Sequence, residues 1–333
     1  SSATVVNKAG LIETVGSGKP RIDFSNDAKG ALLLEPTTLN LVPYSEDFSN
    51  SAWTRGGNIT VFGGYLAPDG SNNAYKVNGS GSALNSPMSL ISTTTRSIYA
   101  RTVSGTGSIN LLSYFGNTNN LFTVTEEWQR FEVNNSISTG VSSFYAVDFR
   151  GGTLSELIIW GANATNDQSY ATSYIPNFGN SAGATRSADS SSLSNDAFVD
   201  PQNGNKTYTF NFSLPIIDGV SVYDLMSKFV DNSNRFRLSF RSSQPDFELF
   251  MKIGGVNLVF IVFSAALVAN TDYELKIVIN NGVSNQVYLN GVLQTLTSDT
   301  HSAGNITLNT PFYLGSYHTA LTSNVNIKSF KTQ

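Results

Sequence analysis

The stretch Arg235-Phe236-Arg237-Leu238-Ser239-Phe240-Arg241 alternates strictly between polar and apolar residues. Successive side chains of a β-strand point to opposite faces, so the alternation predicts a strand with Phe236, Leu238 and Phe240 on one buried face. The apolar residues Val222 to Val230 precede this strand across a polar turn. We expect them to form the first arm of a hairpin.

The residues that follow repeat the same pattern. Short alternating runs at Phe247–Ile253, Tyr273–Ile279 and Gln286–Leu289 are separated by turn residues, including Asn280-Asn281-Gly282 and Asn290-Gly291. Asn-Gly is a strong hairpin signal because both central residues of a type I′ turn need positive φ. Many short strands joined by such turns predict antiparallel β-sandwiches.

The length of the chain predicts two cores. A chain of 333 residues with 40% hydrophobic residues suits two domains of ordinary size. A Ser-, Ala- and Gly-rich stretch from Gly179 to Asn195 marks the expected boundary. We expect a short docking segment at residues 1–38, a first sandwich at 39–190 and a second at 195–333.

The charge and cysteine content exclude several classes of partner. Only 13% of residues are charged and the formal net charge is −4, without the clustered Lys and Arg that phosphate binding needs. The chain has no Cys, which excludes disulfides and thiolate metal sites. The longest apolar stretch, Val256 to Val268, falls short of the ~20 residues that span a bilayer. We expect neither a nucleic-acid partner nor membrane insertion.

Several motifs of the first 190 residues occur together: Gly10–Val15, Pro20–Phe24, Gly30–Glu35, Asn40–Phe48 with Trp53, Trp160–Ala162, Ser173–Pro176 and Ala184–Asp189. As a set they resemble a segment common in bacteriophage tail, fibre and head-fibre proteins. The resemblance implies a jelly roll similar to family 4/9/22-type carbohydrate-binding modules. It also implies a virion-surface or extracellular location, host polysaccharide and other virion proteins as partners, and a homotrimer.

The C-terminal part resembles a different sandwich. The strand pair Tyr273–Ile277 and Val287–Gly291 is similar to one found in laminin-G and concanavalin-like domains. The expected fold class is therefore all-β, with two tandem antiparallel sandwiches after a short N-terminal segment. Neither fold fixes a function, which must be argued from the site.

Catalytic motifs are missing from the sequence. Only His301 and His318 could serve as histidine bases, and neither lies near a G-x-S-x-G motif. The closely spaced acids that concanavalin-like hydrolases use are also missing, because Glu126-Glu127 and Glu46-Asp47 are adjacent pairs whose side chains would point to opposite faces of a strand. The sequence predicts a protein that is not an enzyme.

A structural calcium ion is the one cofactor that the resemblance implies. Jelly rolls of this type often bind calcium through side-chain and main-chain oxygens near their first and last strands. Asn40, Asp47 and Asp148 are the candidate ligands, since calcium prefers hard oxygen donors. The alternative is that Asp47 caps a turn and Asp148 is solvated.

Sugar binding requires aromatic faces flanked by amides and charged groups. Tyr114, Phe115 and Asn117 fit this description best, with Tyr65 and Arg101 as neighbours. A second candidate cluster joins Tyr313, Tyr317 and His318 near late turns of the second domain. We assign Trp128 and Trp160 to core packing, the usual role of large aromatic residues.

These observations favour a phage virion protein, on a tail or head fibre, that attaches to host-cell glycans without catalysis. The alternatives are a purely structural virion decoration protein without a ligand, a bacterial extracellular lectin module, and a glycan depolymerase or lyase. The sequence leaves open which of the two domains carries the binding site.

Overall fold

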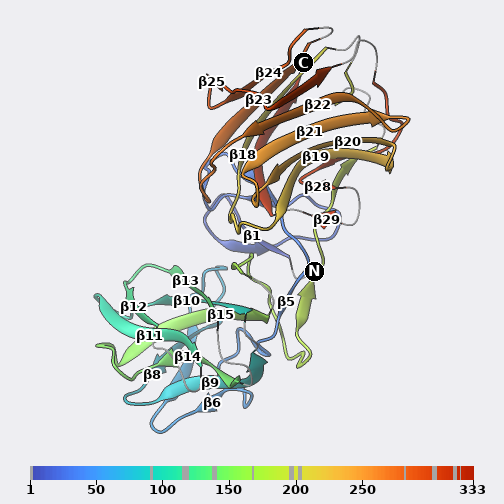
Figure 1. Ribbon diagram of the computed structural model, residues 1–333. Helices are drawn as coiled ribbons and strands as arrows, with labels where there is room; N and C mark the ends of the chain where they lie inside the picture. Colours follow the sequence, from blue (N-terminus) through green and yellow to red (C-terminus); the bar gives the residue numbers. More distant parts are fainter. Residues whose placement is uncertain are drawn as a thin grey trace. The chain divides into compact units, whose positions relative to one another are not determined.

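A computed structural model describes residues 3–90, 93–114, 120–136, 141–166, 169–194, 199–201, 205–280, 283–301, 306–317, 321–322 and 324–333 (Figure 1). These residues contain no α-helix and form antiparallel sheets, which confirms the predicted all-β fold class. Across the same residues, no helix has the length and apolarity to cross a membrane. The chain divides into unit 1, Ser1–Lys19 with Thr37–Ser187, and unit 2, Pro20–Pro36 with Ala188–Gln333.

Within its described residues, unit 1 is built from two five-stranded sheets. The first has the order β13 (Gln129–Ser136), β10 (Thr93–Arg101), β15 (Glu156–Asn166), β8 (Ala74–Asn78) and β7 (Thr60–Tyr65). The second has the order β12 (Leu121–Val124), β11 (Gly107–Tyr114), β14 (Val141–Asp148), β9 (Ala83–Leu90) and β6 (Thr54–Arg55). Most consecutive strands from β8 to β15 alternate between the two sheets, which is the connectivity of a jelly roll.

The core of unit 1 lies between these two sheets. Ile98 and Ile159 come from the first sheet and Leu111 and Phe144 from the second, and all four are inaccessible to solvent. Trp53 enters the same cluster from the segment before the sheets and donates its indole N–H to the carbonyl of Tyr44. Trp53 is therefore a packing residue.

A smaller apolar cluster covers the other face of the first sheet. Trp160 and Ile158 of β15 meet Tyr174 and Ile12 there. Ile12 belongs to a hairpin of β1 (Thr4–Val6) and β2 (Ile12–Thr14), and nearby β5 (Thr38–Asn40) pairs with β16 (Ala184–Arg186). The Trp160 indole is 1% exposed, which confirms its packing role, whereas Trp128 at the margin of the cluster is only partly buried.

The described part of unit 2 is a sandwich of two seven-stranded sheets. One has the order β17 (Ser191–Leu193), β27 (Phe312–Leu314), β19 (Val222–Asp231), β20 (Asn234–Arg241), β21 (Asp246–Ile253), β22 (Val256–Ser264) and β26 (Ser298–His301). The other has the order β25 (Val292–Leu293), β24 (Gln286–Leu289), β23 (Tyr273–Ile279), β18 (Lys206–Ser213), β30 (Val325–Thr332), β4 (Ala31–Leu34) and β3 (Ile22–Asp23). A short pair, β28 (Ser316–Tyr317) and β29 (Leu321–Thr322), completes the unit.

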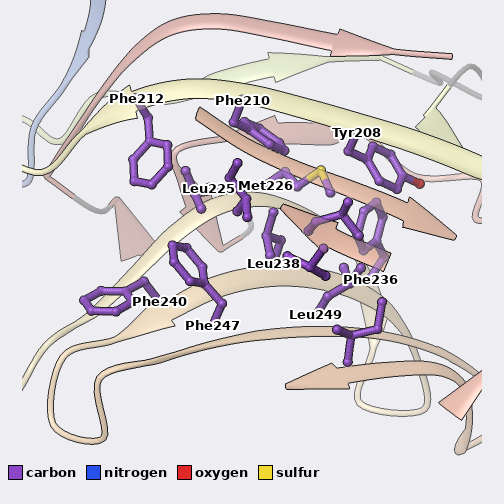
Figure 2. Close-up of a cluster of buried hydrophobic side chains, with 14 of the residues drawn as sticks. Tyr208, Phe210, Phe212, Leu225, Met226, Phe236, Leu238, Phe240, Phe247 and Leu249 are labelled. Atoms are coloured by element: carbon purple, nitrogen blue, oxygen red, sulfur yellow. The ribbon is translucent and has the colours of Figure 1, made fainter. Parts of the chain in front are cut away.

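The core of unit 2 confirms the alternation read from the sequence. Phe236, Leu238 and Phe240 of β20 are fully buried and face Tyr208 and Phe210 of β18 (Figure 2). The predicted hairpin is also present, because β19 pairs with β20 along its length. The polar alternate positions of β20 consequently lie on the opposite face of the sheet.

The N-terminal residues do not form the single segment expected at 1–38. Residues 1–19 belong to unit 1, whereas residues 20–36 supply β3 and β4 to a sheet of unit 2. β4 pairs with β30, with Leu34 opposite Val325. Arg21 in this segment is buried in ion pairs with Glu35 and Asp189. The division between the units at Ser187 and Ala188 falls inside the Gly179–Asn195 stretch.

The Asn290-Gly291 turn between β24 and β25 has positive φ at both residues, +51° and +77°. A Cβ at Gly291 would meet no other atom within 4 Å, so backbone strain alone opposes a side chain there. We expect Gly291→Ala to destabilise unit 2 by about 1–2 kcal/mol in chemical denaturation. Gly16→Ala is the matched control, because Gly16 is equally open but lacks a positive φ. Equal stabilities of the two variants would contradict this prediction.

Candidate functional site

Tyr114, the leading aromatic residue of the sequence prediction, lies in the core of unit 1. It ends β11 opposite Phe144, is only 7% exposed, and has the Arg96 guanidinium 5.4 Å from its ring centroid. The register that directs Phe144 inward directs Tyr114 inward too, so its ring offers no face to a ligand. Phe115 and Asn117 lie outside the described residues.

Tyr65 and Arg101 are not neighbours of Tyr114 in the structure. They end β7 and β10, which belong to the other sheet of unit 1. Tyr65 packs against the small apolar cluster around Trp160. The Arg101 guanidinium lies 5.4 Å from the ring centroid of Trp128. The structure therefore separates the first predicted cluster into residues of two sheets.

The candidate calcium ligands have protein partners. The Asn40 side-chain carbonyl accepts backbone N–H groups of Val42 and Ala164 at 3.0 and 3.1 Å. Asp47 accepts hydrogen bonds from Ser49 and Tyr75, which lower its pKa despite the opposing effect of desolvation. Three or more His, Cys, Asp or Glu side chains placed to hold a metal do not occur in the described part of the chain. Calcium binding stays a prediction.

Tyr317 of the second predicted cluster lies on the outer face of the β17–β26 sheet in unit 2. Arg235 donates a hydrogen bond to its hydroxyl at 3.0 Å, and the Arg237 guanidinium lies 4.4 Å from its ring centroid. Tyr313 is opposite Ser227 on the same sheet and is buried. His318 lies outside the described residues.

A row of four side chains crosses the second sheet of unit 1. Ser113 of β11 is opposite Tyr145 of β14, Tyr145 is opposite Asn85 of β9, and Asn85 is opposite Thr54 of β6. Directly opposed residues of paired strands share a face. Phe144 points into the core, so Tyr145 and its row lie on the other side. We call these four residues and the adjacent Asp148 and Arg150 the Tyr145 face.

Backbone irregularities shape this face. Leu112 has φ +59°, a region that residues with side chains seldom adopt, and its carbonyl accepts hydrogen bonds from Arg96 Nε and Asn120 Nδ2. In β14, the register with β9 shifts between Tyr145 and Val147. Such bulges redirect side chains and are frequent beside functional sites.

Charge on the face is concentrated beside the tyrosine. The Arg150 guanidinium lies 5.7 Å from the Tyr145 ring centroid and donates to Asp148 through Nε at 2.8 Å. That hydrogen bond raises the pKa of Arg150. The Arg150 side chain is 55% exposed, whereas Asp148 is buried. The pair presents an exposed cation fixed by a buried carboxylate.

Two buried polar groups on this face have unused hydrogen-bonding capacity. Ser113 Oγ and Asn110 Oδ1 are buried and make no hydrogen bond within the part of the chain that the structure describes. Asn110 is opposite Asp148, three residues along both strands from the Tyr145 row, and the irregularities at Leu112 and between Tyr145 and Val147 bring this pair to the same face. Buried polar groups in proteins are nearly always satisfied, so each unsatisfied group requires an explanation. A half-buried aromatic ring beside amide, hydroxyl and guanidinium groups has the chemistry to contact a polyhydroxyl compound.

The sequence contained little sign of Tyr145. It follows Phe144 in an ordinary strand-like stretch, and only the register with β11 and β9 shows which neighbour faces outward. One local cue exists in the sequence: Tyr145 is flanked by the apolar residues Phe144, Ala146 and Val147. Strict alternation would not place all three of these residues in the core, where the structure has them. Tyr145 is the one partly exposed residue of this run.

No protein-family model and no curated protein sequence matches the chain. Among solved structures, the chain is similar to a carbohydrate-binding module from Bacillus subtilis, with TM-score 0.28, 14% identity, and coverage of 43% of this chain and 77% of that one. It is also similar to a galectin from Caenorhabditis elegans (TM-score 0.29, 12% identity, 43% and 90% covered) and to a tandem domain pair of mouse laminin α1 (TM-score 0.31, 9% identity, 77% and 86% covered). Values this low carry no argument about what the chain binds.

Proposed function

We propose that the chain binds a saccharide of the bacterial cell surface through the Tyr145 face and leaves it intact, as an attachment protein on a bacteriophage virion. The observation that carries the proposal is the row Ser113, Tyr145, Asn85 and Thr54, which places an aromatic ring among polar groups on the non-core face of a sheet. The virion location rests on the motifs of the first 190 residues.

The chemistry of the face suits a sugar ring. The apolar C–H face of a pyranose would gain by covering the exposed part of the Tyr145 ring. The hydroxyl groups around that sugar would find hydrogen-bond partners in Asn85 and Arg150.

A face of this kind gives weak binding at a single site. A shallow contact buries little area and must still offset the loss of translational and rotational freedom. Several copies on one particle would raise the apparent affinity by about 10²-fold or more. We therefore propose a homo-oligomer, a trimer by the resemblance to phage fibres, attached to other virion proteins.

We expect Tyr145→Ala to weaken binding of host-surface oligosaccharides by about tenfold or more, the effect of removing an aromatic anchor worth ~2 kcal/mol. Isothermal titration of the full chain with fragments of host polysaccharide measures it. Tyr288→Ala is the matched control, because Tyr288 is also half-buried beside a cation, Lys276, but lies in unit 2.

Three outcomes would overturn the proposal. If Tyr145→Ala and Tyr288→Ala weaken saccharide binding equally, the Tyr145 face is not the binding site. Steady shortening of the polysaccharide during incubation would make the chain an enzyme. A chain that binds none of the host's surface saccharides, even when displayed in many copies, would be a decoration protein without a ligand.

A further inference from the structure

Three arginines of β20 share the outer face of the β17–β26 sheet in unit 2, and two of them are clamped by carboxylates. Arg237 donates through Nε and Nη2 to Asp224 at 2.5 and 3.2 Å. Arg241 donates through the same two nitrogens to Asp246, both at 2.8 Å, and Glu248 lies 3.2 Å from its Nη1. This bidentate geometry is the strongest arrangement of a guanidinium with a carboxylate.

Arg235, the third arginine, has no such clamp. Its Nε is buried and makes no hydrogen bond to any described residue, and its Nη1 donates to the neutral oxygens of Tyr317 and Asn232 at 3.0 and 3.3 Å. The guanidinium lies 4.9 Å from the ring centroid of Phe250. Aromatic, hydroxyl and amide contacts therefore hold a guanidinium that pairs with no carboxylate among the described residues.

A second cation lies directly opposite this arginine. Lys252 of β21 is the register partner of Arg235, and neither residue forms an ion pair within the described part of the chain. Like charges directly opposed on paired strands destabilise a sheet. The acids of the same face, Asp224, Asp246 and Glu248, are engaged with the other two arginines.

We infer that Arg235 and Lys252 form a binding site for the anionic group of an acidic saccharide. The inference deepens the proposed function and rests on it for the saccharide. An anion beside the two cations would relieve their repulsion and take the role that Asp224 and Asp246 have on the neighbouring arginines. Carboxylate and phosphate oxygens share the required chemistry.

The test is titration calorimetry of the full chain with three probes of matched length: a uronic-acid oligosaccharide, a phosphorylated oligosaccharide and a neutral one. We expect an acidic probe to bind, and Arg235→Gln and Lys252→Gln each to weaken it about tenfold, the typical effect of losing a hydrogen bond to a charged group. Whichever acidic probe binds more tightly identifies the anion. Lys276→Gln removes an equal charge from the opposite sheet of unit 2 and should leave the affinity unchanged.

Equal affinities of the parent chain for acidic and neutral probes would overturn the inference. So would equal losses in Arg235→Gln, Lys252→Gln and Lys276→Gln, which would indicate attraction to net charge alone. Thermal unfolding confirms that each variant is folded, and Lys252→Gln still tests the site if Arg235→Gln is unstable. Tyr145→Ala separates the two proposals. If the Tyr145 face is not a binding site, this variant binds the neutral probe as the parent chain does, and the acidic probes still test Arg235 and Lys252 independently.

Discussion

Asp200→Ala is expected to destabilise unit 2 by about 3–5 kcal/mol, because it leaves the ammonium of Lys228 buried without its carboxylate. Lys228 Nζ donates to both carboxylate oxygens of Asp200 at 2.9 Å, and the two side chains are 0% and 1% exposed. The backbone N–H of Leu308 donates to the same carboxylate. The pair therefore fixes two chain segments against β19.

Chemical denaturation of the variant measures this loss. Asp272→Ala is the control, because Asp272 pairs with Lys328 at 2.7 Å but is 64% exposed, and an exposed pair contributes only about 0–1 kcal/mol. Desolvation raises the pKa of Asp200 by more than the nearby Lys228 lowers it. Ionising this carboxyl group therefore costs more free energy in the folded chain than in the unfolded one. The double variant Lys228→Met, Asp200→Leu should accordingly be close to the parent chain in stability. Equal losses of unfolding free energy in Asp200→Ala and Asp272→Ala would contradict the prediction that the buried pair matters more than the exposed one.

Trp160→Ala is expected to cost unit 1 about 3–5 kcal/mol, the usual range for truncating a large buried aromatic residue. The indole ring centroid lies 4.7 Å from that of Tyr174 and 5.6 Å from that of Tyr99, and its N–H donates to Asn73 Oδ1 at 2.8 Å. The variant loses both the packing and the partner of Asn73.

Denaturant unfolding followed by circular dichroism gives the magnitude. Trp128→Ala provides the comparison, because Trp128 is only partly buried and should cost clearly less. If Trp128→Ala lowers the free energy of unfolding as much as Trp160→Ala does, the difference in burial does not determine the contribution of these two residues to stability. The sequence assigned both to packing, and only the structure separates them.

Local patterns were sufficient to predict the fold class and several strands of unit 2. The alternation at Arg235–Arg241 placed Phe236, Leu238 and Phe240 in the core, and Val222–Val230 formed the predicted hairpin arm. These predictions succeed because the side-chain period of a strand and the backbone needs of Asn-Gly turns are properties of neighbouring residues.

Long-range pairing was beyond the reach of these patterns. β4 joins the sheet of unit 2 by pairing with β30, which lies at the other end of the chain, so residues 20–36 could not be assigned to unit 2 from local sequence. The prediction of Tyr114 as a stacking residue was wrong because local sequence does not show which face of β11 it lies on. That face depends on the irregular backbone at Leu112 and on the pairing of β11 with β14. Tyr145 was missed for the same reason, since its exposure follows from its register with β11 and β9.

Binding of a host saccharide to the Tyr145 face, without cleavage, is the function that we propose for the chain. Its most direct test is a titration of the isotope-labelled chain with a host-surface oligosaccharide, followed by amide chemical shifts over hours. We expect shift changes centred on Tyr145, Asn85 and Ser113, reversed by removing the ligand, with the ligand's own signals unchanged at the end. Shift changes confined to other residues, or new signals from a shortened oligosaccharide, would contradict it.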